Sequence, residues 1–138
     1  MRVFFDNCVS PKIVQALTDL LVEQDEKPEL VHLRDRFRPD TPDAEWLHEL
    51  GEDGDWIIVS ADPRISRGRP ERDAWRESGL TAFFLGDPWS NRQLMDQAAA
   101  LVKAWRAIIR EAKNAKPGAG FSVDYTSGRV RSLWEADG

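Results

Sequence analysis

Four short apolar runs, each followed by a segment of helical character, limit this chain to few folds. The run Trp56-Ile57-Ile58-Val59 is apolar at every position and too short for a helix, which predicts a strand covered on both faces. Strands of that kind belong to parallel sheets, and their alternation with helices predicts a three-layer α/β domain with a central parallel sheet. The expected strands span residues 2–5, 30–33, 56–59 and 80–85.

Helix start signals occur between these runs. Ser10-Pro11 places a hydroxyl cap before a proline at the first helical position, and Thr41-Pro42 repeats the pattern. Residues 34–42 are polar and are expected to form a loop before the second helix. The first three helices are expected over about residues 11–21, 43–50 and 70–78.

The C-terminal third carries two further signals. Ser90 and Gln93 have the spacing of a capping box and precede an apolar stripe that continues to about residue 113, which predicts the longest helix. Apolar and polar residues then alternate from 121 to 125, before a Thr-Ser-Gly turn, which favours a C-terminal β-hairpin or extended tail. We therefore expect a domain over residues 1–114 and an extension over 115–138.

The composition is that of an ordinary globular protein, with 41% hydrophobic and 31% charged residues in 138. We expect no membrane span and no signal peptide, because no apolar run approaches the roughly 20 residues that a bilayer requires. The single cysteine, Cys8, excludes an intrachain disulfide, which favours the cytoplasm. The net charge of −5 argues against nucleic-acid binding by overall attraction, although residues 64–76 are rich in arginine.

Three aspartates occupy comparable places in this pattern. Asp6 directly follows the first strand, Asp62 follows the third strand in "DWIIVSADPRI", and Asp43 lies in the first turn of the second helix. The carboxyl ends of neighbouring parallel strands meet at one sheet edge, where α/β proteins bind ligands. Carboxylates gathered there repel one another unless a cation lies among them, and oxygen ligands without histidine or cysteine indicate Mg²⁺ or Mn²⁺.

Each acid also has a structural interpretation. Asp43 is favoured by the helix dipole, while Asp6 and Asp62 fit turns. Asp35, after the second strand, is a candidate fourth metal ligand, or else it pairs with a neighbouring arginine. The residues alone leave these alternatives open.

Three segments together resemble a known family. They are "MRVFFDNCVSP", "HLRDRF" followed by "DTPDAEWL", and "DWIIVSADPRI". In their order and spacing, over roughly residues 1–110, they are similar to the PIN-like branch of the VapC toxin group, ribonucleases related to PIN domains.

The resemblance implies a three-layer PIN-like α/β fold and Mg²⁺- or Mn²⁺-dependent hydrolysis of RNA phosphodiesters. The catalytic and metal-binding acids would be Asp6, Asp43 and Asp62. The family's usual fourth acid has no clear match, because Asp87 is displaced by a glycine, and this leaves open whether one or two metals bind. The expected substrate contacts are Arg64, Arg67 and Asn7. The expected partners are RNA, a cognate antitoxin protein and a second copy of the chain.

Two other classes of function stand beside the nuclease. In a non-catalytic PIN-like binding module, the acids would be turn residues and the arginines a partner-binding surface. A receiver-like phospho-accepting domain is less favoured, because Asn7 rather than a second acid follows Asp6 and the late-strand lysine is missing.

Overall fold

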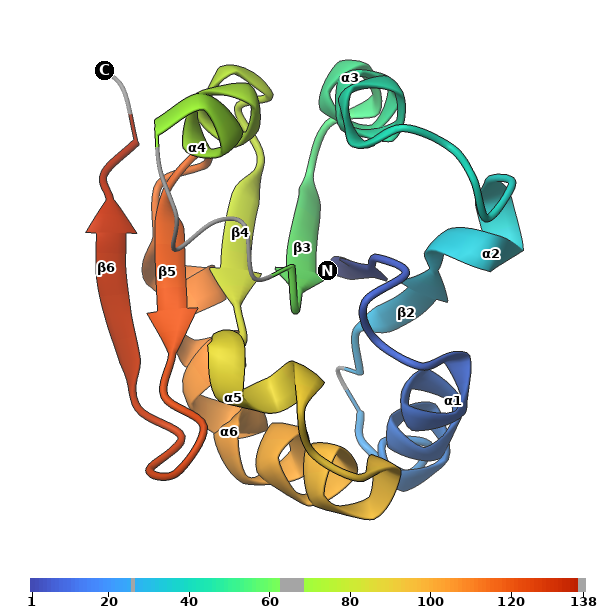
Figure 1. Ribbon diagram of the computed structural model, residues 1–138. Helices are drawn as coiled ribbons and strands as arrows, with labels where there is room; N and C mark the ends of the chain where they lie inside the picture. Colours follow the sequence, from blue (N-terminus) through green and yellow to red (C-terminus); the bar gives the residue numbers. More distant parts are fainter. Residues whose placement is uncertain (26, 63–68, 137–138) are drawn as a thin grey trace.

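The computed structural model describes residues 1–25, 27–62 and 69–136, and these residues form one six-stranded sheet. The strand order is β2-β1-β3-β4-β5-β6; the first five strands are mutually parallel and β6 is antiparallel to β5. The N-terminus lies in the middle of the sheet and the C-terminus beside its outer strand (Figure 1). The strands are β1 (Arg2–Phe5), β2 (Glu29–His32), β3 (Trp56–Ser60), β4 (Thr81–Phe84), β5 (Gly120–Val123) and β6 (Val130–Trp134). The predicted α/β fold with a central parallel sheet is confirmed.

Helices cover both faces of this sheet, as the continuous apolar strands require. Phe5 packs in a core with α1 (Pro11–Leu20) and α6 (Leu94–Asn114), while Phe4 points to the other face, against α3 (Asp43–Asp53) and α4 (Arg69–Glu77). Both phenylalanines are fully buried. The two pairs of helices lie on opposite sides of the strands in Figure 1. Within the described ranges, no helix has the length and apolar character of a membrane span.

The segment after β2 differs from its prediction. The second strand ends at His32 rather than Leu33, and the expected polar loop begins with a short helix, α2 (Leu33–Arg36). His32 caps this helix, since its Nδ1 accepts a hydrogen bond from the Arg34 backbone N–H at 3.1 Å. The expectation of a loop was wrong because histidine is not among the usual cap residues on which it relied.

Two predicted helix caps are also wrong, although Ser10 does cap α1 as expected. Thr41 does not cap α3; its hydroxyl donates to the Arg38 carbonyl at 2.7 Å, and Pro42 holds the cap position. The Ser90–Gln93 capping box does not form, because Ser90 ends a separate short helix, α5 (Asp87–Ser90). The longest helix then begins at Leu94 without a side-chain cap.

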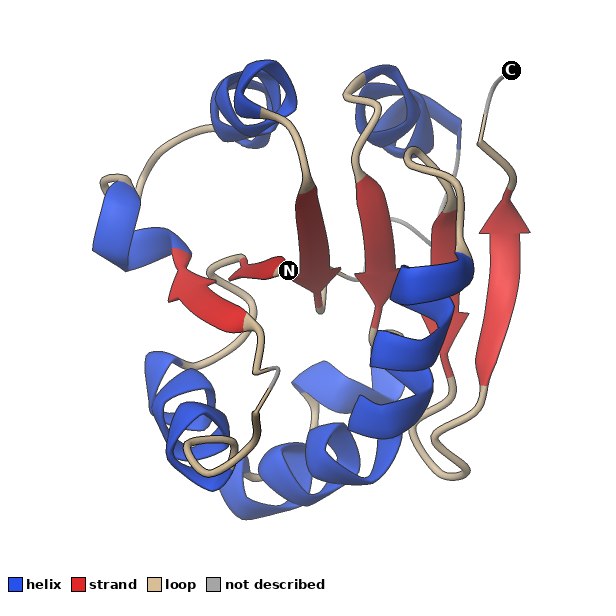
Figure 2. Cartoon of the chain, turned by 180° about the vertical axis from the view of Figure 1, so that it is seen from behind, coloured by secondary structure: helices blue, strands red, loops and turns tan. Residues whose placement is uncertain are grey.

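The C-terminal segment forms the predicted hairpin and also extends the main sheet. β5 pairs in parallel with β4, and β6 forms the outer edge, which Figure 2 shows from behind. A register shift beside Gly120 places the Trp134 indole over that glycine, where a Cβ atom would lie 2.3 Å from the ring. The indole N–H donates to the Gly118 carbonyl at 2.9 Å, so the end of β6 is fixed to the sheet.

Candidate metal and nucleic-acid site

Asp6 and Asp62 lie at the carboxyl edge of the sheet, at the ends of two neighbouring strands. β1 pairs directly with β3, with Phe5 opposite Val59, so the residues that follow the two strands are brought together. Both aspartates are buried, with exposed fractions of 4% and 8%. The chain topology therefore brings these two acids to one edge, as the strand pattern predicts.

Ser60 connects these two acids. Its hydroxyl donates a hydrogen bond to Asp6 Oδ2, and its Oγ accepts from the Asp62 backbone N–H at 3.1 Å. The other oxygen of Asp6, Oδ1, accepts from the Cys8 backbone N–H at 3.1 Å. Ser60 is fully buried, so this link is shielded from water. The sequence analysis missed Ser60; the available signal was a hydroxyl at the last position of an otherwise apolar strand.

The environment of Asp6 disfavours its charged form. Burial, together with the negative charges of Asp43 and Asp62, raises the pKa of Asp6 from its ordinary 3.8 to about 7, even though the hydrogen bonds from Ser60 and Cys8 act to lower it. Asp43 and Asp62 are thus near enough to act electrostatically on Asp6. The three predicted acids therefore interact electrostatically at Asp6.

Asp43 acts on Asp6 from the start of α3. It is half-buried, and its Oδ1 accepts a hydrogen bond from the Trp46 indole N–H at 3.2 Å. Trp46 is itself fully buried against Phe4 of β1. The packing of α3 on the sheet therefore fixes the position of this carboxylate.

Asp35 has a local contact of its own. Its Oδ2 accepts from the His32 backbone N–H at 3.0 Å, which completes a reciprocal capping box on α2. The ring of His32 is buried and held at both nitrogens, since Nε2 donates to the Val9 carbonyl at 2.7 Å. Burial lowers the pKa of His32, and the contact with Arg34 N–H requires an unprotonated Nδ1. His32 therefore connects the start of α2 to the loop that follows β1, and Asp35 fixes the backbone of His32.

Of the expected substrate contacts, the structure describes Asn7. This exposed side chain accepts a hydrogen bond from Arg34 Nε at 3.2 Å and donates one to the Pro39 carbonyl. Asn7 therefore joins the loop beside Asp6 to the segment between α2 and α3. Arg64 and Arg67 lie outside the described residues.

The donor set at this edge is compatible with a hard divalent cation, although the ligands are not gathered into a cage. Within the part of the chain that the structure describes, no three His, Cys, Asp or Glu side chains come close enough together to hold a metal ion. Mg²⁺ is usually bound by one or two carboxylates and retains several waters, so a three-carboxylate cage is not required. Asp6, at the end of β1, supplies a carboxylate of the kind that Mg²⁺ binds.

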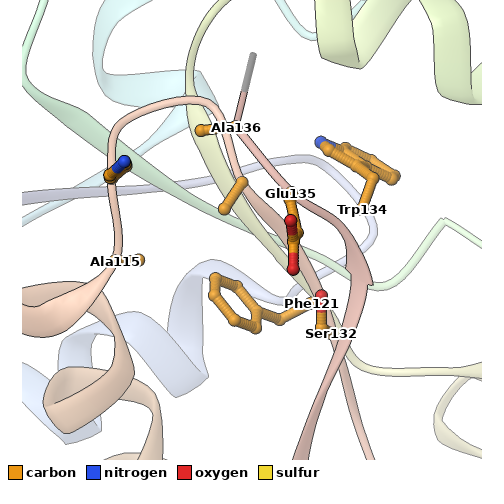
Figure 3. A pocket seen from close by; sticks show the side chains of 8 residues that line it. Ala115, Phe121, Ser132, Trp134, Glu135 and Ala136 are labelled. Carbon is orange, nitrogen blue, oxygen red and sulfur yellow. The ribbon is translucent and has the colours of Figure 1, made fainter. Parts of the chain in front are cut away.

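A separate hollow of about 330 Å³ lies near the end of α6, at the sheet edge opposite the acids. Figure 3 shows Phe121 and Ser132, from the paired strands β5 and β6, together with Glu135 among the side chains that line it. β5 begins beside the hollow, whereas Asp6 and Asp62 follow the ends of strands that run parallel to β5. The hollow and the two acids therefore lie at opposite edges of the sheet, and the hollow is not part of the acidic site.

Comparison with known families identifies the fold. The family described as "PIN like domain" matches residues 1–87, a segment that contains Asp6, Asp43 and Asp62. Searches of curated proteins and of solved structures found no match. Since the family match covers more than half of the chain, and since the chain has the α/β sheet described above, this protein belongs to the PIN-like domain family.

Proposed function

We propose that this chain is a Mg²⁺- or Mn²⁺-dependent endoribonuclease that acts at the edge formed by Asp6, Asp43 and Asp62. The observation that carries the proposal is the state of Asp6, a buried carboxylate held by Ser60 with a pKa raised to about 7 in the field of two other acids. Buried acids that repel one another cost stability, and such strongly perturbed groups cluster at functional sites. PIN-like domains are commonly nucleases, which agrees with this interpretation.

In this proposal different residues bind the metal ion, position its ligand and contact the substrate. A bound Mg²⁺ or Mn²⁺ would act as a Lewis acid and supply an activated water for attack on a phosphodiester. Asp6 would bind the ion directly, and Asp43 and Asp62 would bind it directly or through its waters. Ser60 would hold Asp6 in place, and Arg64, Arg67 and Asn7 would contact the substrate.

The biological setting is proposed from the resemblance to the VapC toxin group. On that basis the chain would be a cytoplasmic toxin, RNA its substrate, and a cognate antitoxin its regulator. A homodimer is proposed on the same ground.

One observation favours a second candidate function, a non-catalytic PIN-like binding module. Among the described residues the acids do not converge into a three-ligand site, as would be expected if they were turn residues. The two candidates differ in one measurable property: the nuclease should bind Mg²⁺ through Asp6 and Asp62, and the binding module should not.

Substitution of Asp62 by Asn tests the proposal. The amide keeps the shape of the side chain but removes the charge, so Mg²⁺-dependent cleavage of a mixed RNA substrate should fall by about a hundredfold or more. Asp19→Asn makes the same chemical change at an exposed site on α1 and should cleave normally. Thermal melting with and without Mg²⁺ should show stabilisation of the wild type and of Asp19→Asn, and little for Asp62→Asn. Wild-type cleavage by Asp62→Asn would exclude the assigned role, and no cleavage by any of the three proteins would favour the binding module.

A further inference from the structure

A groove of about 380 Å³ lies along the second half of α6, against the connection between α1 and β2. Trp105 and Ile109 are its apolar lining on the helix, and Pro28 contributes from the connection. Arg106, Arg110 and Lys113 also line it, and we call this surface the basic groove.

The three cations of the basic groove form no salt bridge with the residues that the structure describes. They are spaced by four and three residues, so they lie on one face of α6, where like charges repel one another. Their side chains are exposed and form no ion pair or hydrogen bond with the rest of the described chain. Among the described residues that line the groove none is a carboxylate, although the whole chain carries a net charge of −5. This cluster is therefore suited to an anionic ligand.

Exposed aliphatic side chains lie in the neighbouring chain segment. Leu20 and Val22 are 66% and 59% exposed, and they precede Gln24, which lines the groove. Large aliphatic residues that remain exposed beside a charged surface are typical of protein–protein contacts. A nucleic-acid strand would instead use an accessible aromatic ring for stacking, but the groove's Trp105 is only 7% exposed. These features favour a protein ligand over a nucleic acid.

The basic groove is also separate from the acidic site. α6 begins after α5, at the edge where β4 ends, and it finishes before the start of β5, at the opposite edge. Its second half therefore lies toward the start of β5 and away from the edge at which β1 and β3 end (Figures 1 and 2). A ligand in the groove would leave the acidic site open.

We propose that the basic groove binds an acidic segment of a partner protein, one that carries aliphatic side chains among its carboxylates. The carboxylates pair with Arg106, Arg110 and Lys113, and the aliphatic groups cover Ile109 and Pro28. Arg–carboxylate pairs supply charge-assisted hydrogen bonds, and the apolar contacts make the site selective for a peptide. This proposal does not depend on nuclease activity.

The test uses the full chain and a short fluorescein-labelled peptide of alternating glutamate and leucine. We expect fluorescence anisotropy to show binding that weakens with salt, and the double variant Arg106→Gln/Arg110→Gln to bind at least about tenfold more weakly. The matched control is Arg129→Gln/Arg131→Gln, which removes the same charge from exposed positions of the hairpin and should bind as the wild type does. Melting temperatures of both variants confirm that they are folded.

Three outcomes would overturn the proposal. The first is an absence of peptide binding to the wild type. The second is an equal loss of binding in the two double variants, which would show attraction by overall charge alone. The third is competition by oligouridine at lower concentration than unlabelled peptide, with the same dependence on Arg106 and Arg110, which would make the groove a nucleic-acid surface.

Discussion

Replacement of Asp6 by Asn should make the protein more stable at neutral and alkaline pH. Burial and the charges of Asp43 and Asp62 raise the pKa of Asp6 to about 7, so the folded protein resists ionisation of this carboxyl group. In the unfolded chain the same group ionises at its ordinary pKa of 3.8. The folded state therefore binds more protons than the unfolded state between these two values, and its stability falls as pH rises through that window.

The size of the effect follows from the two pKa values. A change from 3.8 to about 7 corresponds to about 4 kcal/mol, present in full below the unfolded pKa and lost by the time the pH passes the folded one. That is a large part of the roughly 5–15 kcal/mol by which domains are stable. Asn carries no titrating group, and Ser60 Oγ is able to accept from its amide. The variant should therefore gain up to about 4 kcal/mol over the wild type at pH 8 and little at pH 4.

Urea unfolding followed by tryptophan fluorescence, in EDTA and at several pH values between about 4 and 8, measures this difference. Asp53→Asn is a control of opposite sign. The Trp56 indole N–H, which donates to Asp53 at 2.8 Å, lowers the pKa of that carboxyl group, so its contribution is present at neutral pH and lost as pH falls. A constant difference between Asp6→Asn and wild type across the pH range would refute the assigned pKa. If Asp6 is a metal ligand, Mg²⁺ should stabilise the wild type and should not stabilise Asp6→Asn.

Three other substitutions test separate parts of the structure. Ser60→Ala removes the hydrogen-bond donor to Asp6 and should lower the free energy of unfolding by about 1–3 kcal/mol. Because that hydrogen bond lowers the pKa of Asp6, its loss should also move the pH dependence of stability to higher pH, and an unchanged pH profile would contradict the hydrogen bond. Gly120→Ala places a Cβ atom 2.3 Å from the Trp134 ring and should cost about 1–3 kcal/mol in urea unfolding, a loss that the additional change Trp134→Leu should partly reverse. His32 has a pKa lowered below 6.5 by burial, so its own contribution to stability should be lost as pH drops below 6.5; thermal melts at pH 7.5 and pH 5 should therefore show the wild type losing stability relative to His32→Gln.

The sheet could be predicted from the sequence because burial on both faces leaves a strong signal. The run at 56–59 forms most of β3, and the strand pattern at 80–85 contains β4. The hairpin at 121–134 was also predictable from its alternation and its turn. Its place in the central sheet was not, since β5 pairs with β4 across the whole length of α6 and local sequence patterns carry no information on such pairing.

Helix boundaries were less predictable because different local contacts can satisfy the same backbone groups. From the sequence, the hydroxyls of Thr41 and Ser90 were expected to cap helices. In the structure each donates a hydrogen bond to the carbonyl three residues earlier. In contrast, His32 performs a capping role that its residue type does not suggest. The choice between these contacts is made by packing, because His32 also donates to Val9 on the loop after β1.

The shared edge of Asp6 and Asp62 was predictable from the sequence, and the residue that connects them was not. Asp6 and Asp62 follow strands that any parallel α/β topology can bring together, so their positions in sequence were sufficient to predict one shared edge. Ser60 acts on both acids only because β1 and β3 are direct neighbours, which places a β3 hydroxyl within hydrogen-bonding distance of the carboxylate that follows β1. That neighbour relation is a property of strand order. The same hydroxyl accepts from the Asp62 N–H, so a change in the charge of Asp6 would be transmitted to the backbone that carries Asp62. A metal bound at Asp6 would therefore order both acids through one buried serine, and Ser60→Ala should weaken the Mg²⁺-dependent stabilisation even though the residue supplies no metal ligand.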